Sequence, residues 1–251
     1  MKRAALVLVA LAFVAGCAGD DEASPTTETT TATVETTTVS VYMLRDGKVW
    51  PVAREVEATE TIATAVLGEL TKGPSDEESA SLGLTSALPT DGPQLNTISV
   101  IDGIARYGSS EDLSNDALAQ VVYTLAKLPT VETVEINGRP HTRADFEDFT
   151  PAILVESPLA FEEVANPLRV TGTANTFEAT FSYELTDTDG LIVDENFVTA
   201  TSGTGTRGTF DFTTKPYAVP FDGVGALIVF ERSAKDGSRI NLVEIPLPMR
   251  R

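Results

Sequence analysis

One cysteine and one histidine are present among the 251 residues of the chain. These side chains often act as a nucleophile, a proton carrier or a soft metal ligand. His141 lies in the sequence NGRPHTR, and catalysis of the Ser-His-Asp type needs a histidine that a carboxylate orients beside a nucleophile. A single histidine followed by arginine gives no such set, so we interpret His141 as an exposed loop residue after the last strand of its region. The usual zinc sites need more cysteines or histidines than the chain offers.

Carboxylates are frequent, because the chain contains 37 Asp and Glu residues. Glu162-Glu163 and Asp194-Glu195 are adjacent in sequence, so neither pair predicts a shared cleft. The sequence TDTDG, Thr186–Gly190, lacks the third acidic position and the distant bidentate glutamate of a calcium loop, so we interpret it as a β-turn. TSGTGTRG is rich in glycine, but no helix N-terminus is expected beside it to bind phosphate. The sequence therefore predicts no catalytic, cofactor or metal site.

The N-terminal segment suggests another use for Cys17. Met1-Lys2-Arg3 precedes the apolar run AALVLVALAFVAG, which is the order of a secretory signal. The run is shorter than the roughly 20 residues of a membrane-spanning helix, so we expect residues 1–16 to be removed. Val14–Cys17 resembles the lipobox of bacterial lipoproteins. That resemblance implies a diacylglycerol on the Cys17 sulfur and an additional acyl chain, such as palmitate, on the new N-terminus. The alternative is a plain secretory signal with a chance cysteine.

Residues 17–38 are rich in threonine and acidic residues and nearly free of large apolar ones. Such a segment cannot bury enough surface to fold, so we predict a disordered tether. A flexible coil of about 20 residues has a dimension of roughly 25 Å, which would hold the folded part off the membrane but near it. Whether the threonines are glycosylated stays open.

The remaining composition limits the partners and the source of stability. Removal of Lys2 and Arg3 leaves 16 basic against 37 acidic residues, a formal charge of −21. Nucleic acid and charge-driven binding to anionic lipid are not expected, because both need a basic face. With no second cysteine there is no disulfide framework, so we expect each domain to stand on its own hydrophobic core.

Residues 39–148 are predicted to form an α+β domain. Alternating apolar and polar residues about Asp46-Gly47 and about Asp102-Gly103 indicate two hairpins. A final strand is expected in VETVEINGRP, and the order ββ-α-ββ-α-β predicts a mixed sheet with two helices on one side. One predicted helix ends at Gly73-Pro74, and its apolar face comprises Ile62, Val66, Leu67 and Leu70. The other ends before Pro129, and its apolar face comprises Leu118, Val121, Val122 and Leu125.

This order resembles the GerMN domain of bacterial sporulation and germination lipoproteins, which implies a noncatalytic assembly module. The matching residues are spread over the segment and comprise Val41-Tyr42, Val52, Arg54, Leu70, Gly73-Pro74, Gly83-Leu84, Leu88-Pro89, Asp102-Gly103, Gln120, Tyr123 to Leu125, and Val134 to Gly138.

Several of these matched residues have structural interpretations. Gly73, Gly103 and Gly138 are expected at turns with positive φ. We expect Arg54 to pair with a carboxylate, and Gln120 to lie at the surface or to face a partner.

Residues 150–251 are predicted to contain strands only. Phe177, Ala179, Phe181, Tyr183 and Leu185 alternate with polar residues, which is typical of a half-buried strand. Short strands at regular spacing predict a β-sandwich of about 100 residues.

The segment resembles the immunoglobulin-like domain of bacterial spore germination proteins. The matching residues are Ile153 to Val155, Ser157-Pro158, Asn166-Pro167, Val170 to Gly172, Ala174 to Ala179, Gly208, Phe210, Phe230, and Ser233 to Gly237. The Cys-Trp-Cys pattern of antibody domains is missing, which leaves the topology open.

Together these features predict a noncatalytic envelope lipoprotein, exported and anchored to the outer face of the bacterial cell membrane through a lipid on Cys17. It would bind or assemble components outside the membrane, with an envelope protein or a second copy as partner and no nucleic acid; the resemblance adds a link to sporulation or spore germination. A peptidoglycan-binding lipoprotein is an alternative, with Trp50 and the tyrosines stacking on sugars. An accessory subunit of an envelope enzyme is another, and would need a pocket with converging polar groups and shifted pKa values.

Overall fold

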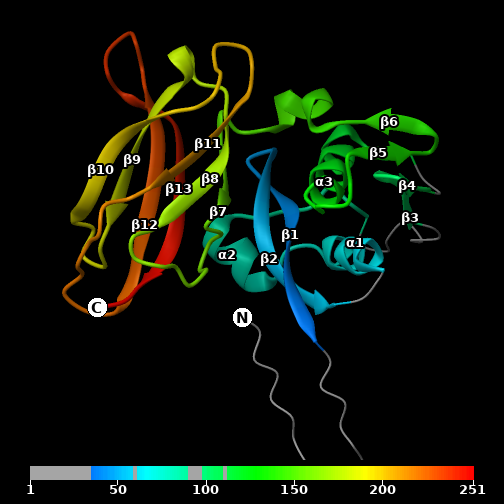
Figure 1. The fold of residues 1–251 in the computed structure, drawn as a ribbon, viewed down its shortest axis with the longest axis horizontal. Helices are drawn as coiled ribbons and strands as arrows, with labels where there is room; N and C mark the ends of the chain where they lie inside the picture. The colour runs from blue at the N-terminus through cyan, green and yellow to red at the C-terminus, as the bar shows by residue number, and fades with distance from the viewer. Residues whose placement is uncertain (1–34, 59–60, 90–97, 110–111) are drawn as a thin grey trace, which may run out of the picture. The chain divides into compact units, whose positions relative to one another are not determined.

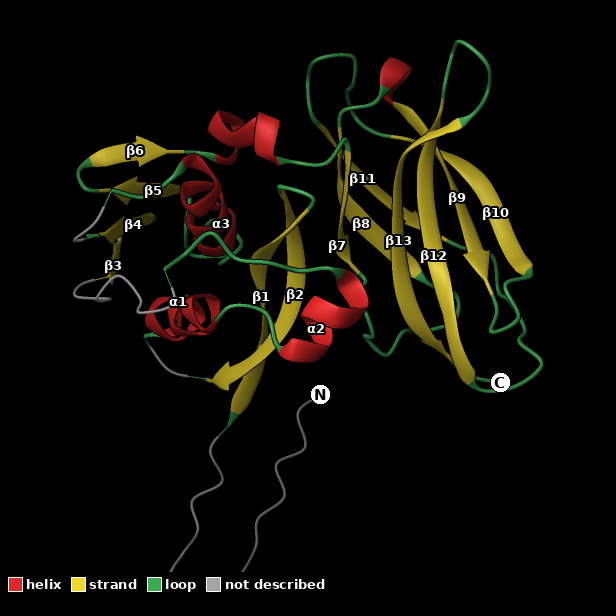
Figure 2. Cartoon of the chain, turned by 180° about the vertical axis from the view of Figure 1, so that it is seen from behind, coloured by secondary structure: helices red, strands yellow, loops and turns green. Residues whose placement is uncertain are grey.

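The computed structural model describes residues 35–58, 61–89, 98–109 and 112–251. The predicted leader, Cys17 and most of the predicted tether therefore lie outside the described residues. Residues 34–251 form one compact unit, whose strands and helices are drawn in Figure 1 and, from behind, in Figure 2. Within the described ranges, no helix has the length and apolar character needed to cross a membrane.

The first predicted hairpin is confirmed. β1 (Thr36–Arg45) and β2 (Lys48–Glu57) pair antiparallel as a two-stranded sheet. Asp46 and Gly47 turn the chain with φ values of 50° and 71°, a conformation that glycine adopts freely and aspartate tolerates. β1 begins inside the segment that the sequence assigned to the tether.

The first predicted helix is confirmed, with its apolar face turned inward. α1 (Ile62–Lys72) buries Val66, Leu67 and Leu70 and ends at Gly73, whose φ is 74°. The second predicted helix is α3 (Asn115–Leu125), and the Ser114 side chain caps its N-terminus by accepting a hydrogen bond from the Ala117 N–H.

A short helix that the sequence did not predict follows α1. α2 (Asp76–Leu82) begins with a capping box, in which Ser75 and Glu78 bond each other's backbone N–H groups. The Glu78 carboxylate also receives both terminal nitrogens of Arg54, at 2.6 and 2.7 Å. The expected pairing of Arg54 with a carboxylate is confirmed, and it ties α2 to β2.

The second sheet is mixed, but it does not include the first hairpin. Its order is β3-β4-β5-β6, with β4 and β5 parallel and the other pairs antiparallel. The single mixed sheet expected for both hairpins is therefore wrong. The expected last strand is also two strands, because Asn137 and Gly138 form a tight turn with φ values of 49° and 76°. The strands are β3 (Ile98–Ile101), β4 (Ile104–Tyr107), β5 (Thr133–Ile136) and β6 (Arg139–His141).

A 3₁₀ segment, η1 (Arg143–Phe149), leads into two facing antiparallel sheets, which we call the sandwich. One sheet has the order β11-β8-β7 and the other β10-β9-β12-β13, and their inner faces meet where the rings of Tyr183 and Phe212 stack at 4.6 Å. The strands are β7 (Ile153–Ser157), β8 (Arg169–Ala174), β9 (Thr180–Thr186), β10 (Ile192–Thr199), β11 (Gly208–Thr213), β12 (Gly223–Arg232) and β13 (Arg239–Met249).

The predicted alternation in β9 is correct only from Thr180 to Tyr183, because Glu184, expected on the polar face, is also buried. Phe181, Tyr183 and Leu185 are buried as expected. Phe177 is 56% exposed, because η2 (Phe177–Ala179) replaces the start of the strand, with positive φ at Glu178 and Ala179.

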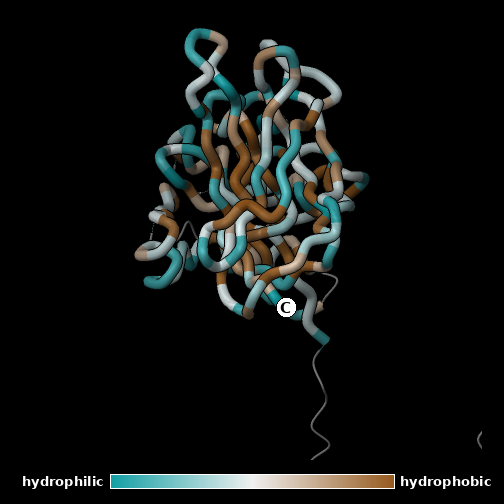
Figure 3. Tube along the Cα trace, turned by 90° about the vertical axis from the view of Figure 1, so that its left-hand side faces the viewer, coloured by the Kyte–Doolittle hydropathy of each residue, from teal (hydrophilic) through white to brown (hydrophobic). Residues whose placement is uncertain are grey.

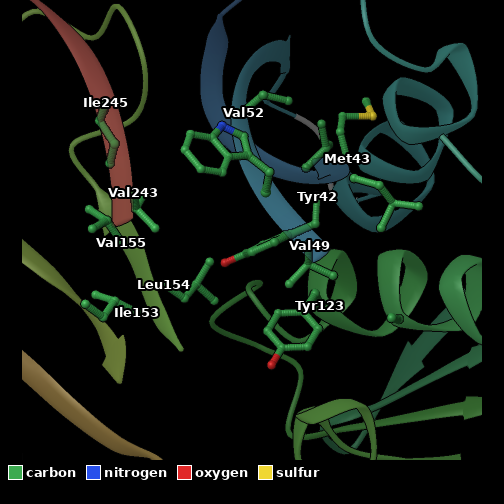
Figure 4. Close-up of a cluster of buried hydrophobic side chains, with 14 of the residues drawn as sticks. Tyr42, Met43, Val49, Val52, Tyr123, Ile153, Leu154, Val155, Val243 and Ile245 are labelled. Carbon is green, nitrogen blue, oxygen red and sulfur yellow. The ribbon is translucent and has the colours of Figure 1, made fainter. Parts of the chain in front are cut away.

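A single hydrophobic cluster runs through both the α+β part (residues 35–149) and the sandwich. Figure 4 shows Tyr42 of β1 extending toward Leu154 of β7, with Val243 and Ile245 of β13 nearby. Along the trace in Figure 3, hydrophobic stretches follow interior strands, while many turns are hydrophilic. The expectation of a separate core for each domain is therefore wrong, since the buried side chains of the two parts pack together in one cluster.

Candidate functional site

Glu156, near the end of β7, is the centre of a charged cluster between the α+β part and the sandwich. Its carboxylate accepts a hydrogen bond from the Tyr42 hydroxyl and another from Arg143 Nη1 at 2.8 Å, and Lys127 Nζ lies 3.4 Å from its second oxygen. The Arg143 guanidinium also lies 5.4 Å from the ring centroid of Tyr42 and 4.8 Å from that of Tyr123. We call these five residues the junction cluster.

The ionisation of the junction cluster is set by burial and by its internal pairs. Burial raises the pKa of the Tyr42 hydroxyl well above its ordinary value. Burial also acts to raise the pKa of Glu156, but the charge of Arg143, the hydrogen bond from Tyr42 and the charge of Lys127 together hold it below its ordinary value. Near neutral pH the carboxylate is therefore charged and the phenol neutral, which suits a structural ion pair better than proton transfer.

A second polar contact joins η1 to the sandwich. Arg207, in the loop between β10 and β11, bonds Glu147 through Nε at 2.8 Å and Nη2 at 2.9 Å. Asn175 donates to the same carboxylate at 2.9 Å, and Arg207 also donates to the Pro151 carbonyl. The hydrogen bond from Arg207 lowers the pKa of Glu147. A bidentate arginine–carboxylate pair fixes orientation as well as distance, so it holds η1 in place.

Threonines line the outer face of β8 and β11 beside these contacts. Thr173 lies opposite Thr209, and the Thr201 hydroxyl accepts a hydrogen bond from the Thr209 N–H at 2.9 Å. With Glu156 and neighbouring residues, they line a cleft of about 510 Å³. Thr173 also lines an adjoining cleft of about 490 Å³ that reaches Tyr123, Arg143 and Arg207. We call this surface the threonine groove, defined by Thr171, Thr173, Thr199, Thr201 and Thr209.

An accessory subunit of an enzyme would need a pocket with converging polar groups, and the threonine groove has them. Its charged groups, however, are already paired with other side chains of the chain. Arg143 is bound to Glu156, Arg207 to Glu147, and Asp211 to Arg169 at 2.5 Å. A threonine nucleophile needs a free base within hydrogen-bond reach, and Glu156 is held by its ion pairs. The hydroxyls, by contrast, act as both donors and acceptors. The groove is therefore suited to hydrogen-bonding a polar ligand.

The structure decides the environment of two residues singled out in the sequence, correcting the expectation for His141 and placing Trp50 in the core rather than on a sugar-stacking surface. His141 is not in a loop: it ends β6 opposite Val134, and its ring lies 5.8 Å from that of Phe146. Trp50 is only 7% exposed and lies under the Arg45 guanidinium, so it cannot provide a surface for stacking on sugars.

Gln120 is fully buried, which corrects the expectation of a surface or partner-facing residue. Its amide nitrogen donates to the Tyr42 carbonyl at 3.0 Å, and its amide oxygen accepts from the Ala87 N–H at 2.8 Å. One helical turn later, the Thr124 hydroxyl accepts from the Tyr42 N–H at 3.0 Å. Two side chains of α3 thus satisfy the backbone of a buried strand, and buried polar groups of this kind are usually bonded.

The turn at Thr186–Gly190 agrees with the β-turn interpretation. The Asp187 carboxylate accepts from the backbone N–H groups of Asp189 at 3.0 Å and Leu191 at 2.9 Å, and Gly190 has a φ of 78°. Among the described residues, no group of three or more His, Cys, Asp or Glu side chains is placed to hold a metal ion. Cys17 lies outside the described residues, so its lipid stays a prediction.

The sequence did not reveal the junction cluster. Tyr42 and Glu156 are 114 positions apart, and neither belongs to a motif of known chemistry. The one usable signal is Thr171-Gly172-Thr173, whose alternation places two hydroxyls on one face of a strand.

Two family models match successive parts of the chain. Residues 40–142 match a family model described as "Sporulation and spore germination", and residues 152–238 match one described as "Immunoglobulin-like domain of bacterial spore germination". The comparison with curated proteins found no match. Among solved structures, the tandem GerMN domains of the sporulation protein GerM from Bacillus subtilis align at 25% identity with a TM-score of 0.35, covering 43% of this chain. The chain spans 42% of that structure's length.

Proposed function

Because this chain carries a sporulation and spore germination domain followed by an immunoglobulin-like domain of bacterial spore germination, we propose that it is an exported, noncatalytic assembly module. Its domain content supports a germination-related role. In this proposal a lipid on Cys17 anchors it to the outer face of the cell membrane, and the folded unit binds another envelope protein. The threonine groove is the binding surface.

The observation that carries the proposal is the junction cluster. Its contacts, together with the shared hydrophobic cluster, hold the two family segments as one unit. A preorganised surface loses little conformational freedom when it binds, which favours affinity. The groove uses side chains from β8, β11, the end of β10 and the segment that follows it, with Glu156 and Arg143 at its border. A partner that assembles on this surface would meet side chains that the fold already holds in place.

The chemistry of the groove supports a polar protein segment as the ligand. Exposed hydroxyls of Thr199, Thr201 and Thr209 accept and donate hydrogen bonds, and β11 is an edge strand of its sheet. At Thr209 the backbone N–H and carbonyl of this edge are already bonded to Thr201, so an extended peptide would pair with the edge on the C-terminal side of Thr209 while its side chains meet the adjoining pockets.

In-cell crosslinking followed by affinity capture tests this proposal. We expect the full chain to capture a discrete envelope protein, and Thr199→Arg or Thr209→Arg to lose it, because a long charged side chain fills the groove. Thr64→Arg is the matched control, since Thr64 is an exposed threonine on α1. Equal capture by the unmodified chain and all three variants, or no specific protein with any of them, would contradict the assembly proposal.

Peptidoglycan is the second candidate, favoured by one observation: the groove presents several hydroxyls beside the carboxylates of Glu156 and Asp211. Such groups form hydrogen bonds with sugars, although Trp50 and most of the tyrosines are buried. Retention on isolated peptidoglycan, measured with Cys17→Ser to remove any lipid, tests it. Retention that Thr209→Arg abolishes would move the function from protein assembly to wall binding.

A further inference from the structure

Large apolar side chains are exposed at one end of the sandwich. Leu191, in the turn between β9 and β10, is 65% exposed, and Ile192, the first residue of β10, is 48% exposed. In the segment that enters β12, Phe221 is 48% exposed and Val224 is 55% exposed. A cluster of exposed apolar side chains commonly marks a surface that meets another apolar phase.

These side chains lie in segments that contact one another. Gly223 is so close to the 187–191 turn that a Cβ there would lie 2.6 Å from Thr188 Cγ2. Val224 pairs with Pro248 in β13, and Phe161, itself 49% exposed, donates its N–H to the Pro246 carbonyl. We call this surface the tip patch, defined by Phe161, Leu191, Ile192, Phe221 and Val224.

The tip patch lies at the end of the unit where β1 begins. In Figures 1 and 2 the start of β1, the C-terminus and the turn that follows β9 all lie toward the lower end. The two views differ by a rotation about the vertical axis, so both preserve this height. β1 therefore begins at the same end of the unit as the tip patch.

We propose that the tip patch contacts the outer surface of the lipid bilayer, with its apolar side chains inserted among the headgroups. This inference rests on the proposed anchoring at Cys17. Thr36 follows Cys17 by 19 positions, and a chain of this length spans at most about 65 Å at ~3.4 Å per residue. An anchored unit can therefore bring this end to the membrane.

Four backbone N–H groups of the turn that carries Leu191 are bonded within the turn, although the Thr188 hydroxyl has no hydrogen-bond partner among the described residues. Asp187 accepts hydrogen bonds from the N–H groups of Asp189 and Leu191 through its side chain and from Gly190 through its carbonyl, and its own N–H bonds the Leu191 carbonyl. Unpaired backbone groups are what make entry into lipid costly. This turn can enter the headgroup region without breaking such bonds.

The contact is apolar rather than electrostatic. Near the tip, Arg250 is paired with Glu163 at 2.5 Å, and Asp222 accepts from the backbone N–H of Arg251. These neighbours offer no unbalanced positive charge, and the whole chain carries a formal charge of −19. Insertion of apolar side chains depends on buried apolar area, so the contact is expected to persist in high salt.

The experiment places an environment-sensitive fluorophore at Leu191→Cys in the mature lipoprotein, reconstituted in vesicles of phosphatidylcholine and phosphatidylglycerol. With a lipid on Cys17, the only natural cysteine, the engineered thiol is the only free one. We expect a blue shift of the emission, quenching by lipids with nitroxide-labelled headgroups, and no reversal in high salt. Phe177→Cys is the matched control: it is 56% exposed and lies at the opposite end of β9, so its label should remain in water.

Flotation of the vesicles measures anchoring separately. A chain that floats while its Leu191 label stays in water, or in which the Phe177 label shifts equally, overturns the membrane contact and leaves the anchoring intact. A chain that carries no lipid fails the anchoring part of the proposed function. In that case Cys17→Ser removes the second thiol, and the fluorophore at Leu191→Cys is measured at high vesicle concentration. A blue shift then supports the membrane contact, and an unchanged spectrum overturns it.

Discussion

The junction cluster and the tip patch reverse the usual placement of side chains. At the junction, the phenolic groups are buried and the charged groups partly buried, and each has a partner within the chain: the Glu156 side chain is only 12% exposed and binds Arg143, Lys127 and Tyr42. At the tip, Leu191 and Phe221 are exposed and nothing in the described chain covers them. The difference separates two uses of unusual side chains. Buried charges fix the two parts of the unit to each other, whereas exposed apolar groups favour a contact outside the unit.

The largest effect should follow from breaking the junction. Glu156→Gln removes the negative charge and leaves Arg143 without its counter-ion. We expect a loss of about 3 kcal/mol in the free energy of unfolding, since removal of one partner of a buried pair costs ~3–5 kcal/mol and Arg143 is 26% exposed. Chemical denaturation measures the loss.

Glu163→Gln is the matched control for that variant. Its pair with Arg250 is exposed on both sides, at 65% and 61%, and exposed pairs contribute only about 0–1 kcal/mol. Equal losses for the two variants would mean that the junction is no more than a surface contact. Two separated unfolding transitions in the unmodified chain would also contradict the shared core.

A smaller but clear effect should follow from crowding the sheet beneath the threonine groove. A Cβ at Gly172 would lie 2.1 Å from the Leu154 carbonyl oxygen and 2.7 Å from Phe210 Cζ. Overpacking of this kind typically costs ~1–3 kcal/mol, so we expect Gly172→Ala to destabilise the chain by about 2 kcal/mol.

Gly68→Ala is the control for Gly172→Ala. Gly68 is inside α1 with nothing within 4 Å of its added Cβ. Alanine is the better helix former, so we expect a gain of about 0.5–1 kcal/mol there. The same thermal or urea unfolding measures both variants, and a stable Gly172→Ala chain would show that the groove sheet is more compliant than its geometry implies.

Sequence reasoning succeeded where the determining forces are local. Asp46-Gly47 and Asp102-Gly103 identify their hairpins because the turn itself demands residues that tolerate positive φ. The apolar face of α1 follows from helical periodicity alone. The short helix α2 was missed because its seven residues make only about two turns, too few for a periodic apolar pattern, although its Ser75–Glu78 capping box was visible in the sequence.

The candidate sites were beyond sequence reasoning for a different reason. Gln120 looks like a surface residue until its partner strand is known, because its burial depends on the Tyr42 carbonyl, 78 positions away. Leu191 and Phe221 look like core residues until the fold leaves them at a turn. In both cases tertiary contacts, not residue type, decide the environment.

Acid should weaken the junction cluster. The pKa of Glu156 is below its ordinary value in the folded chain, so the unfolded chain takes up a proton first as the pH falls. The stability that Glu156 contributes is therefore complete above its ordinary pKa near 4.5 and is lost as the pH falls through the lower, folded-state value. Urea unfolding between pH about 6 and about 3 should show a shallower decline for Glu156→Gln than for the unmodified chain. Parallel declines would assign the acid sensitivity to other carboxylates, such as Glu147 and Glu78.

Substitutions in the tip patch should have the smallest effect on the free energy of unfolding, and a small effect would show that these side chains do not stabilise the fold. Leu191 and Phe221 are about half exposed or more in the folded chain, so folding removes little of their apolar area from water. Replacing each with serine should change the free energy of unfolding by no more than about 0.5 kcal/mol, as for surface positions in general. The same variants should weaken the vesicle contact of the mature chain, measured with the fluorophore at Val224→Cys. A loss of several kcal/mol would mean that these side chains stabilise the fold itself. The contrast with the junction would then disappear, because both regions would serve internal packing.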